Sequence, residues 1–149
     1  RILNYLTLPV VYSEDFYNRL TNYSRYSQLG YLKDVLVGAI SCRYEDDPDT
    51  PDMQVVYIMT ITVLNAYRRY GIGSQLLKRA IDGCKNDKVT KIYLHVLCSN
   101  ESAIGFYKSN GFHIKEELKD YYQDLDPPHC FVFEKDLKDY VPDEHKNLC

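Results

Sequence analysis

The chain of 149 residues has no tryptophan and no Cys-x-x-Cys pair, and its four histidines show no metal-ligand spacing. Structural and catalytic zinc sites are built from closely spaced ligands of these types, so we expect no metal site. The five cysteines are odd in number and scattered, which favours reduced thiols over a disulfide framework. We therefore expect a cytoplasmic protein, with the nucleus as a second compartment.

Long apolar runs and a large charge of one sign are also missing. No run approaches the roughly 20 apolar residues of a membrane span, and we expect no secretory signal. A net charge of −3 gives no reason to expect nucleic acid or an anionic membrane as the main partner. The length and a hydrophobic content of 45% fit one domain with a full core, which we place at residues 1–138, followed by a frayed tail over 139–149.

The pattern of apolar and turn residues predicts the order helix–β–β–β–α–β–α–β–β. Such an order indicates an α/β protein (α+β by some schemes) with helices on both sides of a mixed sheet. Acidic residues 45–52, with two prolines, are expected to form a solvated loop. The expected helices are 1–8, 14–27 (capped by Ser13 and closed by Gly30), 72–84 and 101–109; the expected strands are 31–32, 35–44, 54–63, 91–97, 112–118 and 130–137.

A glycine-containing loop, Arg68-Arg69-Tyr70-Gly71-Ile72-Gly73, follows an apolar strand and opens the amphipathic helix. Glycines let a backbone approach a ligand closely, and a helix N-terminus offers unpaired N–H groups and a positive dipole end. The loop therefore predicts a pyrophosphate cradle, although an isolated Gly-x-Gly pair is equally often a plain turn. Its spacing fits neither a Walker loop nor a dinucleotide-binding fingerprint.

The Arg-x-x-Gly-x-Gly spacing resembles the acetyl-CoA signature of the GNAT acetyltransferases. A second run, Asn100-x-x-Ala103-x-x-Phe106-Tyr107-x-x-x-Gly111-Phe112, is similar to the cofactor-side helix of the same superfamily. The resemblance implies a GNAT fold with a mostly antiparallel sheet, with a first strand missing before Arg1, and acetyl-CoA as cosubstrate. It implies cofactor contacts from Ile61, Val63, Arg68, Arg69, Tyr70, Gly71, Ile72, Gly73, Ser74, Asn100, Ala103, Phe106 and Tyr107.

Further segments, among them Tyr57-Ile58-Met59-Thr60 and Tyr93-Leu94-His95-Val96, resemble the catalytic subunits of N-terminal acetyltransferase E (NatE). That family acetylates the α-amine of protein N-termini, prefers Met followed by an apolar or permissive residue, and associates with the ribosome-bound NatA complex and its large auxiliary subunit. Where the family usually has Phe before Pro-Val, this chain has Leu8, which changes the shape of an apolar pocket. The substrate contacts implied are Leu8, Pro9, Val10, Tyr12, Met59, Tyr121 and Tyr122.

Acetyl transfer to an amine needs a base, and His95 has the residue type for it, since imidazole titrates near neutrality. Its alternative role is a core histidine satisfied by a carbonyl. Tyr57 is the expected partner, either holding a relay water or acting as a base with a lowered pKa; alternatively, it caps the core. The strand that carries Tyr57 has no Asp or Glu, so the carboxylate base of many GNAT enzymes is missing.

Tyr107 is expected to protonate the leaving thiolate or to orient the thioester, and packing under the cofactor is an equal alternative. Backbone N–H groups of residues 59–63 are expected to bind the pantetheine arm and polarise the acetyl carbonyl. Two other readings stay open: a lysine or small-amine acetyltransferase, and a catalytically idle CoA-binding subunit. Lysine, with a pKa of about 10.4 against about 7.7–8.0 for an α-amine, would demand a stronger base and an open groove.

Overall fold

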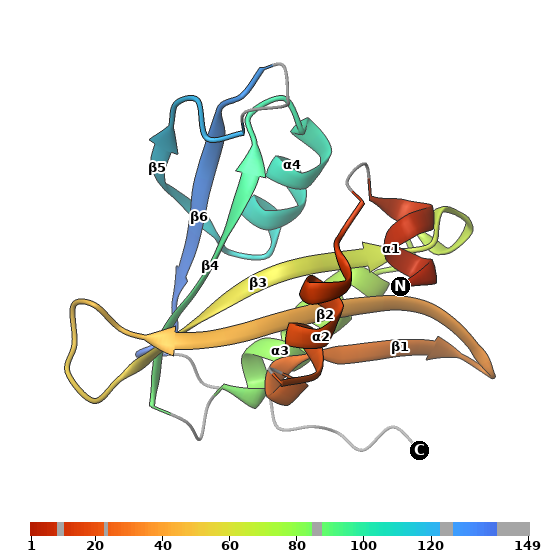
Figure 1. The fold of residues 1–149 in the computed structure, drawn as a ribbon, viewed down its shortest axis with the longest axis horizontal. Helices are drawn as coiled ribbons and strands as arrows, with labels where there is room; N and C mark the ends of the chain where they lie inside the picture. The colour runs from red at the N-terminus through yellow and green to blue at the C-terminus, as the bar shows by residue number, and fades with distance from the viewer. Residues whose placement is uncertain (9–10, 23, 85–87, 123–126, 140–149) are drawn as a thin grey trace.

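The computed structural model describes residues 1–8, 11–22, 24–84, 88–122 and 127–139. Its described elements follow one another with short connections, and Figure 1 shows one twisted sheet with helices against it. In chain order they are α1 (Ile2–Thr7), α2 (Glu14–Asn22), η1 (Ser24–Tyr26), β1 (Gln28–Leu32), β2 (Val35–Asp46), β3 (Gln54–Val63), η2 (Asn65–Tyr67), α3 (Ile72–Gly83), β4 (Val89–Leu97), α4 (Glu101–Ser109), β5 (His113–Leu118) and β6 (Cys130–Asp136).

The six strands form one sheet in the order β1-β2-β3-β4-β6-β5. Every neighbouring pair is antiparallel except β3 and β4, which run parallel. α1 and α2 lie on one face of the sheet, whereas α3 lies behind β1, β2 and β3 (Figure 1). The prediction of a mixed, mostly antiparallel sheet flanked by helices is confirmed.

The core lies between α3 and the sheet. Leu76, Leu77, Ala80 and Ile81 form the buried stripe of α3 that the helical period of the sequence predicts. They pack on alternate residues of the strands, and Tyr107 of α4 extends the same cluster toward β6. The main strand members are Ile40, Cys42, Val56, Ile58, Ile92, Leu94 and Phe133.

β3 and β4 pair only at their beginnings, and this short pairing positions the site. The parallel ladder runs from Gln54 to Tyr57 on β3, and Tyr57 lies opposite Tyr93 on β4. Beyond that point the two strands diverge, as Figure 1 shows. Within the described residues, the edge of β3 that faces β4 therefore has no strand partner over residues 58–63, and its polar groups stay available there.

The predicted caps are present. Ser13 Oγ accepts a hydrogen bond from the Phe16 N–H at 3.3 Å, and Asn100 Oδ1 accepts one from the Ala103 N–H at 3.1 Å. Gly111 has the left-handed φ of 82° expected of a glycine after a helix. The β1–β2 register steps from Gly30↔Gly38 to Tyr31↔Leu36, a shift of the β-bulge type beside Gly38.

Two helix ends differ from the expected ranges. Gly30 does not close the helical region but lies inside β1, where it pairs with Gly38 across the hairpin. The first helix ends at Thr7 and Leu8 is already extended, as expected before a proline, although Pro9 lies outside the described residues.

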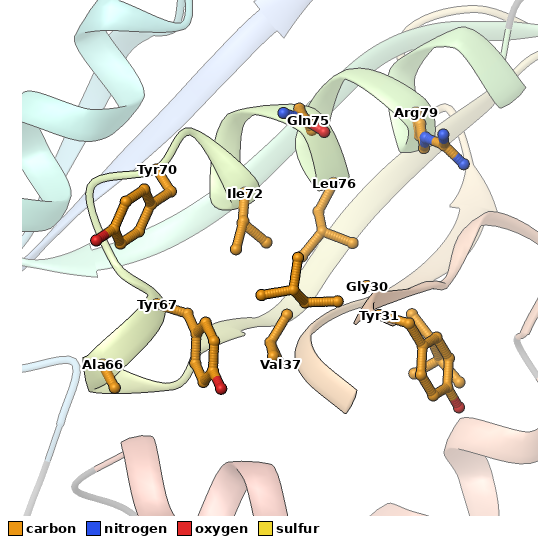
Figure 2. Close-up of a pocket in the computed structure, with 12 residues that line it drawn as sticks. Gly30, Tyr31, Val37, Ala66, Tyr67, Tyr70, Ile72, Gln75, Leu76 and Arg79 are labelled. Carbon is orange, nitrogen blue, oxygen red and sulfur yellow. The ribbon is translucent and has the colours of Figure 1, made fainter. Parts of the chain in front are cut away.

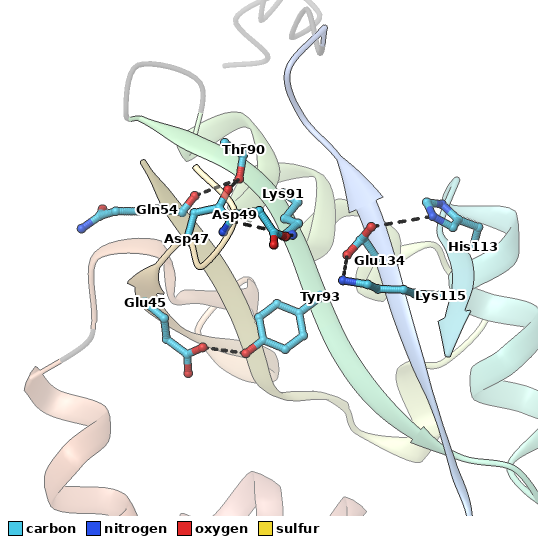
Figure 3. A network of polar contacts seen from close by, with 10 residues as sticks. All are labelled: Glu45, Asp47, Asp49, Gln54, Thr90, Lys91, Tyr93, His113, Lys115 and Glu134. Atoms are coloured by element: carbon cyan, nitrogen blue, oxygen red, sulfur yellow. Dashed lines mark hydrogen bonds and ion pairs between the residues drawn. The ribbon is translucent and has the colours of Figure 1, made fainter. Parts of the chain in front are cut away.

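The acidic segment 45–52 is not a simple solvated loop. β2 continues to Asp46, and the buried Asp47 carboxylate accepts a 2.6 Å hydrogen bond from the Thr90 hydroxyl of β4 (Figure 3). Asp49 pairs with Lys91 at 3.0 Å. Partners distant in sequence thus order a segment whose composition indicates a loop.

Cys42, Cys84, Cys98 and Cys130 are free thiols. No helix among the described residues is long and apolar enough to cross a membrane. Residues 140–149 lie outside the described residues, so the frayed tail stays a prediction.

Candidate active site

A cleft of about 930 Å³ opens where β3 parts from β4. Its walls are the second half of β3, the loop before α3, the start of α3, and α4. Of the predicted cofactor residues only Tyr70 is missing from this cleft. The others line it: Ile61, Val63, Arg68, Arg69, Gly71, Ile72, Gly73, Ser74, Asn100, Ala103, Phe106 and Tyr107.

The loop before α3 has an unusual backbone. Arg69 and Gly71 both adopt left-handed conformations, with φ of 67° and 76°, and Gly71 is the N-cap of α3. No side chain caps this helix, so its first N–H groups have no side-chain partner where they face the cleft. Arg68 stays beside the loop through a 3.0 Å bond from Nε to the Val63 carbonyl. Uncapped N–H groups at the positive end of a helix dipole are suited to a phosphate.

Gly73 lets α3 and α4 approach each other at the cleft floor. A Cβ built there would lie 3.3 Å from the Phe106 ring, closer than side chains normally pack. Thr62, also in the cleft wall, has a buried hydroxyl that finds no hydrogen-bond partner among the described residues. An elongated cleft with unpaired backbone groups along β3 and a cationic, glycine-containing end fits a chain-like ligand that terminates in phosphates, as acetyl-CoA does.

Tyr70 turns away from the cleft. It lines a separate pocket of about 550 Å³ between β1, α3 and the loop after β3, and 74% of its surface is exposed (Figure 2). Ile72 contributes to both cavities because it lies at the turn between them. The predicted cofactor contact from Tyr70 has no support in this arrangement.

Tyr57 and His95 meet on the sheet face opposite α3, near the point where β3 and β4 separate. The His95 Nδ1 and the Tyr57 hydroxyl lie 3.2 Å apart. Tyr121 stacks on the imidazole with ring centres 4.7 Å apart and an interplanar angle of 11°. His95 is half-buried and has a side-chain partner, so the reading of a core histidine satisfied by a carbonyl does not describe it.

Electrostatics separate the roles of these two groups. Burial lowers the pKa of His95 below its ordinary value, and the Arg43 guanidinium lowers it further, against an opposing effect of Glu45. His95 is therefore neutral at pH 7 and able to accept a proton. Burial, with the neighbouring Tyr121 and Tyr122 hydroxyls, raises the pKa of Tyr57 well above its usual range. A raised pKa does not favour Tyr57 as a base, whereas a hydrogen-bonding role, such as holding a relay water, is compatible with it.

Tyr107 is fully buried and packs against Phe106, Phe112 and Phe133. Burial raises the pKa of its phenol above the usual 10. A thiol titrates near 8.5, so such a phenol can donate a hydrogen bond to a thiolate but is too weak an acid to give up its proton readily. The raised pKa favours orienting the thioester over protonating the thiolate, and the aromatic contacts of Tyr107 also fit the third alternative, packing under the cofactor.

One of the predicted peptide-side residues, Leu8, lines the cleft. Met59 follows Tyr57 on the same face of β3, and Tyr121 stacks on His95. Burial raises the pKa of Tyr122 to about 12, and the neighbouring Cys130, Tyr121 and Tyr12 side chains add to the effect. Pro9 and Val10 lie outside the described residues.

The comparison with known families agrees with this geometry. The family model for the acetyltransferase (GNAT) family matches residues 3–112. The chain belongs to the GNAT acetyltransferase family. N-alpha-acetyltransferase 50 of Danio rerio is 39% identical over 137 residues, which cover 91% of this chain and 80% of that protein. The probable N-acetyltransferase san of Drosophila melanogaster is 33% identical, over 96% of this chain and 77% of that protein.

A solved GNAT structure extends the comparison. Arabidopsis thaliana Naa50, in complex with the bisubstrate analogue CoA-Ac-MVNAL, is 41% identical and superposes with a TM-score of 0.80. The match covers 90% of this chain and 87% of that one. The predictions of a GNAT fold, of an acetyltransferase and of acetyl-CoA as the cosubstrate are confirmed.

Three residues around Tyr57 and His95 were not predicted from the sequence: Arg43, Glu45 and Tyr93. Arg43 lies opposite Tyr57 in the β2–β3 register, and its guanidinium carbon is 4.6 Å from the centre of the Tyr57 ring. The alternation of β2 places Arg43 and Glu45 on one face, a signal that the sequence contains. Their partners depend on register, which the sequence does not display.

Proposed function

We propose that this chain transfers the acetyl group of acetyl-CoA to the α-amine of protein N-termini, with a preference for Met followed by an apolar or permissive residue. The observation that carries the proposal is the 3.2 Å contact between His95 and Tyr57, near the point where β3 and β4 separate. A half-buried imidazole with a lowered pKa is a base suited to an α-amine, whose pKa is only about 7.7–8.0.

The peptide side favours an N-terminus over a lysine side chain. The rings of Tyr121 and Tyr122 pack with centres 4.9 Å apart, and we assign them, with Tyr12, to the entrance for the peptide. Such an entrance suits a single extended chain end, whose backbone the tyrosine hydroxyls can bind while Leu8 and Met59 offer apolar surface. The peptide part of the analogue bound to Arabidopsis thaliana Naa50 begins with Met, which supports the same preference here.

The reaction we propose is direct attack in a ternary complex. Acetyl-CoA supplies the acetyl group as a thioester. His95 accepts the proton of the α-amine while the amine nitrogen bonds to the acetyl carbon, and Tyr57 orients the imidazole or a relay water. An N–H on the free edge of β3 polarises the carbonyl. As the carbon–sulfur bond breaks, Tyr107 donates a hydrogen bond to the sulfur, and the thiolate takes its proton from solvent.

The resemblance to NatE subunits adds proposals about the cellular setting. We place the protein in the cytoplasm and nucleus, associated with the NatA complex, its large auxiliary subunit and the ribosome. Co-purification of those subunits with the tagged protein tests the association. We expect the NatA subunits to be recovered in the same amount with and without nuclease treatment.

Acetyl transfer to a peptide panel, read by mass spectrometry, tests the substrate. The panel holds peptides with Met-Leu, Met-Lys, Ser and acidic N-termini and an N-blocked peptide with an internal lysine. We expect strong transfer to Met-Leu and little to the blocked peptide. Transfer mainly to the blocked peptide would reassign the enzyme to lysine. No transfer despite acetyl-CoA binding would favour an idle cofactor-binding subunit.

A further inference from the structure

Two charged residues of β2 lie beside the Tyr57–His95 pair. The guanidinium carbon of Arg43 lies 4.6 Å from the centre of the Tyr57 ring, a distance typical of a cation–π contact. Its Nε donates to Glu45 Oε1 at 2.7 Å. The Arg43 guanidinium is therefore held by the Glu45 carboxylate and lies over the ring of Tyr57.

Glu45 in turn is fixed by β4. Its second oxygen, Oε2, accepts a 2.6 Å hydrogen bond from the Tyr93 hydroxyl, which Figure 3 shows reaching from β4 to the end of β2. The Tyr93 ring packs 5.0 Å from the Tyr57 ring and 6.2 Å from the imidazole of His95. Both carboxylate oxygens are used, so Glu45 joins Arg43 to Tyr93 across the three central strands.

These contacts restrain the Tyr57 ring from β2 and from β4, while its hydroxyl meets His95. We propose that Arg43, held by Glu45 and Tyr93, is a positioning residue that keeps the Tyr57 hydroxyl against His95. The inference deepens the proposed function and rests on it for the identity of the reaction, but its main test does not require turnover.

The charges around His95 make the test selective. Arg43 and Glu45 reach it from β2, Tyr57 from β3, Tyr93 from β4, and Tyr121 stacks on it from the segment after β5. Of these groups, only Arg43 and Glu45 are charged at neutral pH. The Arg43 cation lowers the pKa of His95 and the Glu45 anion raises it. Neutralising one or the other should move the His95 titration in opposite directions.

The experiment is an NMR titration of the imidazole signals in the full chain, with the His95 signal assigned through its loss in His95→Gln. We expect Arg43→Gln to move the midpoint of His95 to higher pH and Glu45→Gln to move it to lower pH. Arg43→Lys, which keeps the charge, should restore the midpoint. Unchanged midpoints, or shifts of the same sign in both variants, would overturn the proposal, because Arg43 and Glu45 would then not lie beside His95 and Tyr57 as the geometry requires.

Kinetics give the positioning half of the test. We expect Arg43→Gln and Tyr93→Phe each to lower kcat by about tenfold, the scale of a misoriented catalytic group, with acetyl-CoA affinity unchanged. Arg19→Gln on α2 and Tyr31→Phe on β1 are matched controls away from the site and should keep wild-type kcat. Equal losses of kcat and cofactor affinity would reject a positioning role. A wild-type enzyme that fails on N-terminal peptides would refute the proposed function and leave the titration result standing.

Discussion

The two sides of the active site are built in different ways. Apart from Thr7 and Leu8, the cofactor cleft draws its residues from two stretches, 61–74 and 100–109, each a strand end or loop that runs into a helix. The cluster around Tyr57 and His95 draws single residues from three strands and one connection, and most of its members are tens of residues apart in sequence. A continuous motif supplies its own geometry, whereas the cluster depends on the register of the sheet.

The difference predicts different sensitivities. Substitutions in the cofactor stretches should act on acetyl-CoA affinity, and those in the cluster should act on the chemical step. A variant in the cofactor stretches that changes only the chemical step, or a variant in the cluster that changes only acetyl-CoA affinity, would contradict this prediction.

His95→Ala should have the largest effect. Loss of a general base typically costs about 10²–10⁴-fold, so we expect kcat to fall by about that factor while the acetyl-CoA Kd changes little. Steady-state kinetics and calorimetric titration of acetyl-CoA measure the two quantities. His113→Ala, at an exposed position of β5, is the matched control and should be silent. Equal losses in kcat and in affinity would mean that His95 is structural.

The pH profile sharpens this prediction. Because burial and Arg43 lower the pKa of His95, the base stays neutral through pH 7 and is lost only as the pH falls below its ordinary range. The contribution of His95, taken as the ratio of wild-type to His95→Ala kcat/KM on one peptide, should stay flat from pH 8 to near 6.5 and shrink at lower pH. The substrate amine titrates identically in both enzymes, so it cancels in the ratio.

Gly71→Val should have the next largest effect, on the cofactor side. No protein atom lies within 4 Å of a Cβ at Gly71, so the side chain would enter the cleft, but the φ of 76° also strains a β-branched residue. We expect acetyl-CoA to bind about tenfold or more weakly, with kcat at saturation little changed.

Gly71→Asn separates the two causes, because asparagine tolerates the left-handed region. Weak binding by both variants indicates crowding of a phosphate, and weak binding by Val alone indicates backbone strain. Gly83→Ala, at the other end of α3 where a Cβ makes only an ordinary contact, should bind as the wild type does. Unchanged affinity in Gly71→Val would remove the phosphate assignment.

The same division explains how far the sequence predicts this molecule. Periodicity and caps are local, so the range 54–63 agrees with β3, and Asn100 caps α4 as expected. Glu45 and Asp47 were wrongly expected to be solvated, because the composition of segment 45–52 indicates an exposed loop. Their hydrogen-bond partners, Tyr93 and Thr90, lie more than 40 residues away on β4. Burial of a carboxylate is set by such partners and not by its neighbours in sequence.

Glu45 and Asp47 also differ from each other in a testable way, since only Glu45 reaches the catalytic cluster. Thr90→Val removes the hydroxyl that satisfies Asp47 and should cost about 1–3 kcal/mol of unfolding free energy with kcat unchanged. Thr62→Val is the matched control for stability, because the buried Thr62 hydroxyl has no partner to lose among the described residues. Denaturant unfolding measures both.

The pH dependence has a definite sign. The Thr90 hydrogen bond lowers the pKa of Asp47 in the folded state, against the effect of burial, so its contribution is present above the unfolded carboxyl pKa of about 4 and is lost as the pH falls through the folded value. The stability difference between wild type and Thr90→Val should therefore shrink below about pH 4. A difference independent of pH would mean that Thr90 acts by packing alone.

Leu8→Phe should have the smallest effect, and it tests whether the two sides are independent. Leu8 is half-buried and lines the cofactor cleft, yet it also begins the segment that leads to Tyr12. A larger apolar side chain should favour a Met N-terminus over Ser by less than about tenfold in kcat/KM, since one group in a hydrophobic pocket discriminates weakly. Ile2→Phe, on the exposed face of α1, is the control. If the acetyl-CoA Kd changes while the Met-over-Ser preference in kcat/KM does not, Leu8 belongs to the wall of the cofactor cleft. The peptide side of the active site would then begin after Leu8 in the sequence.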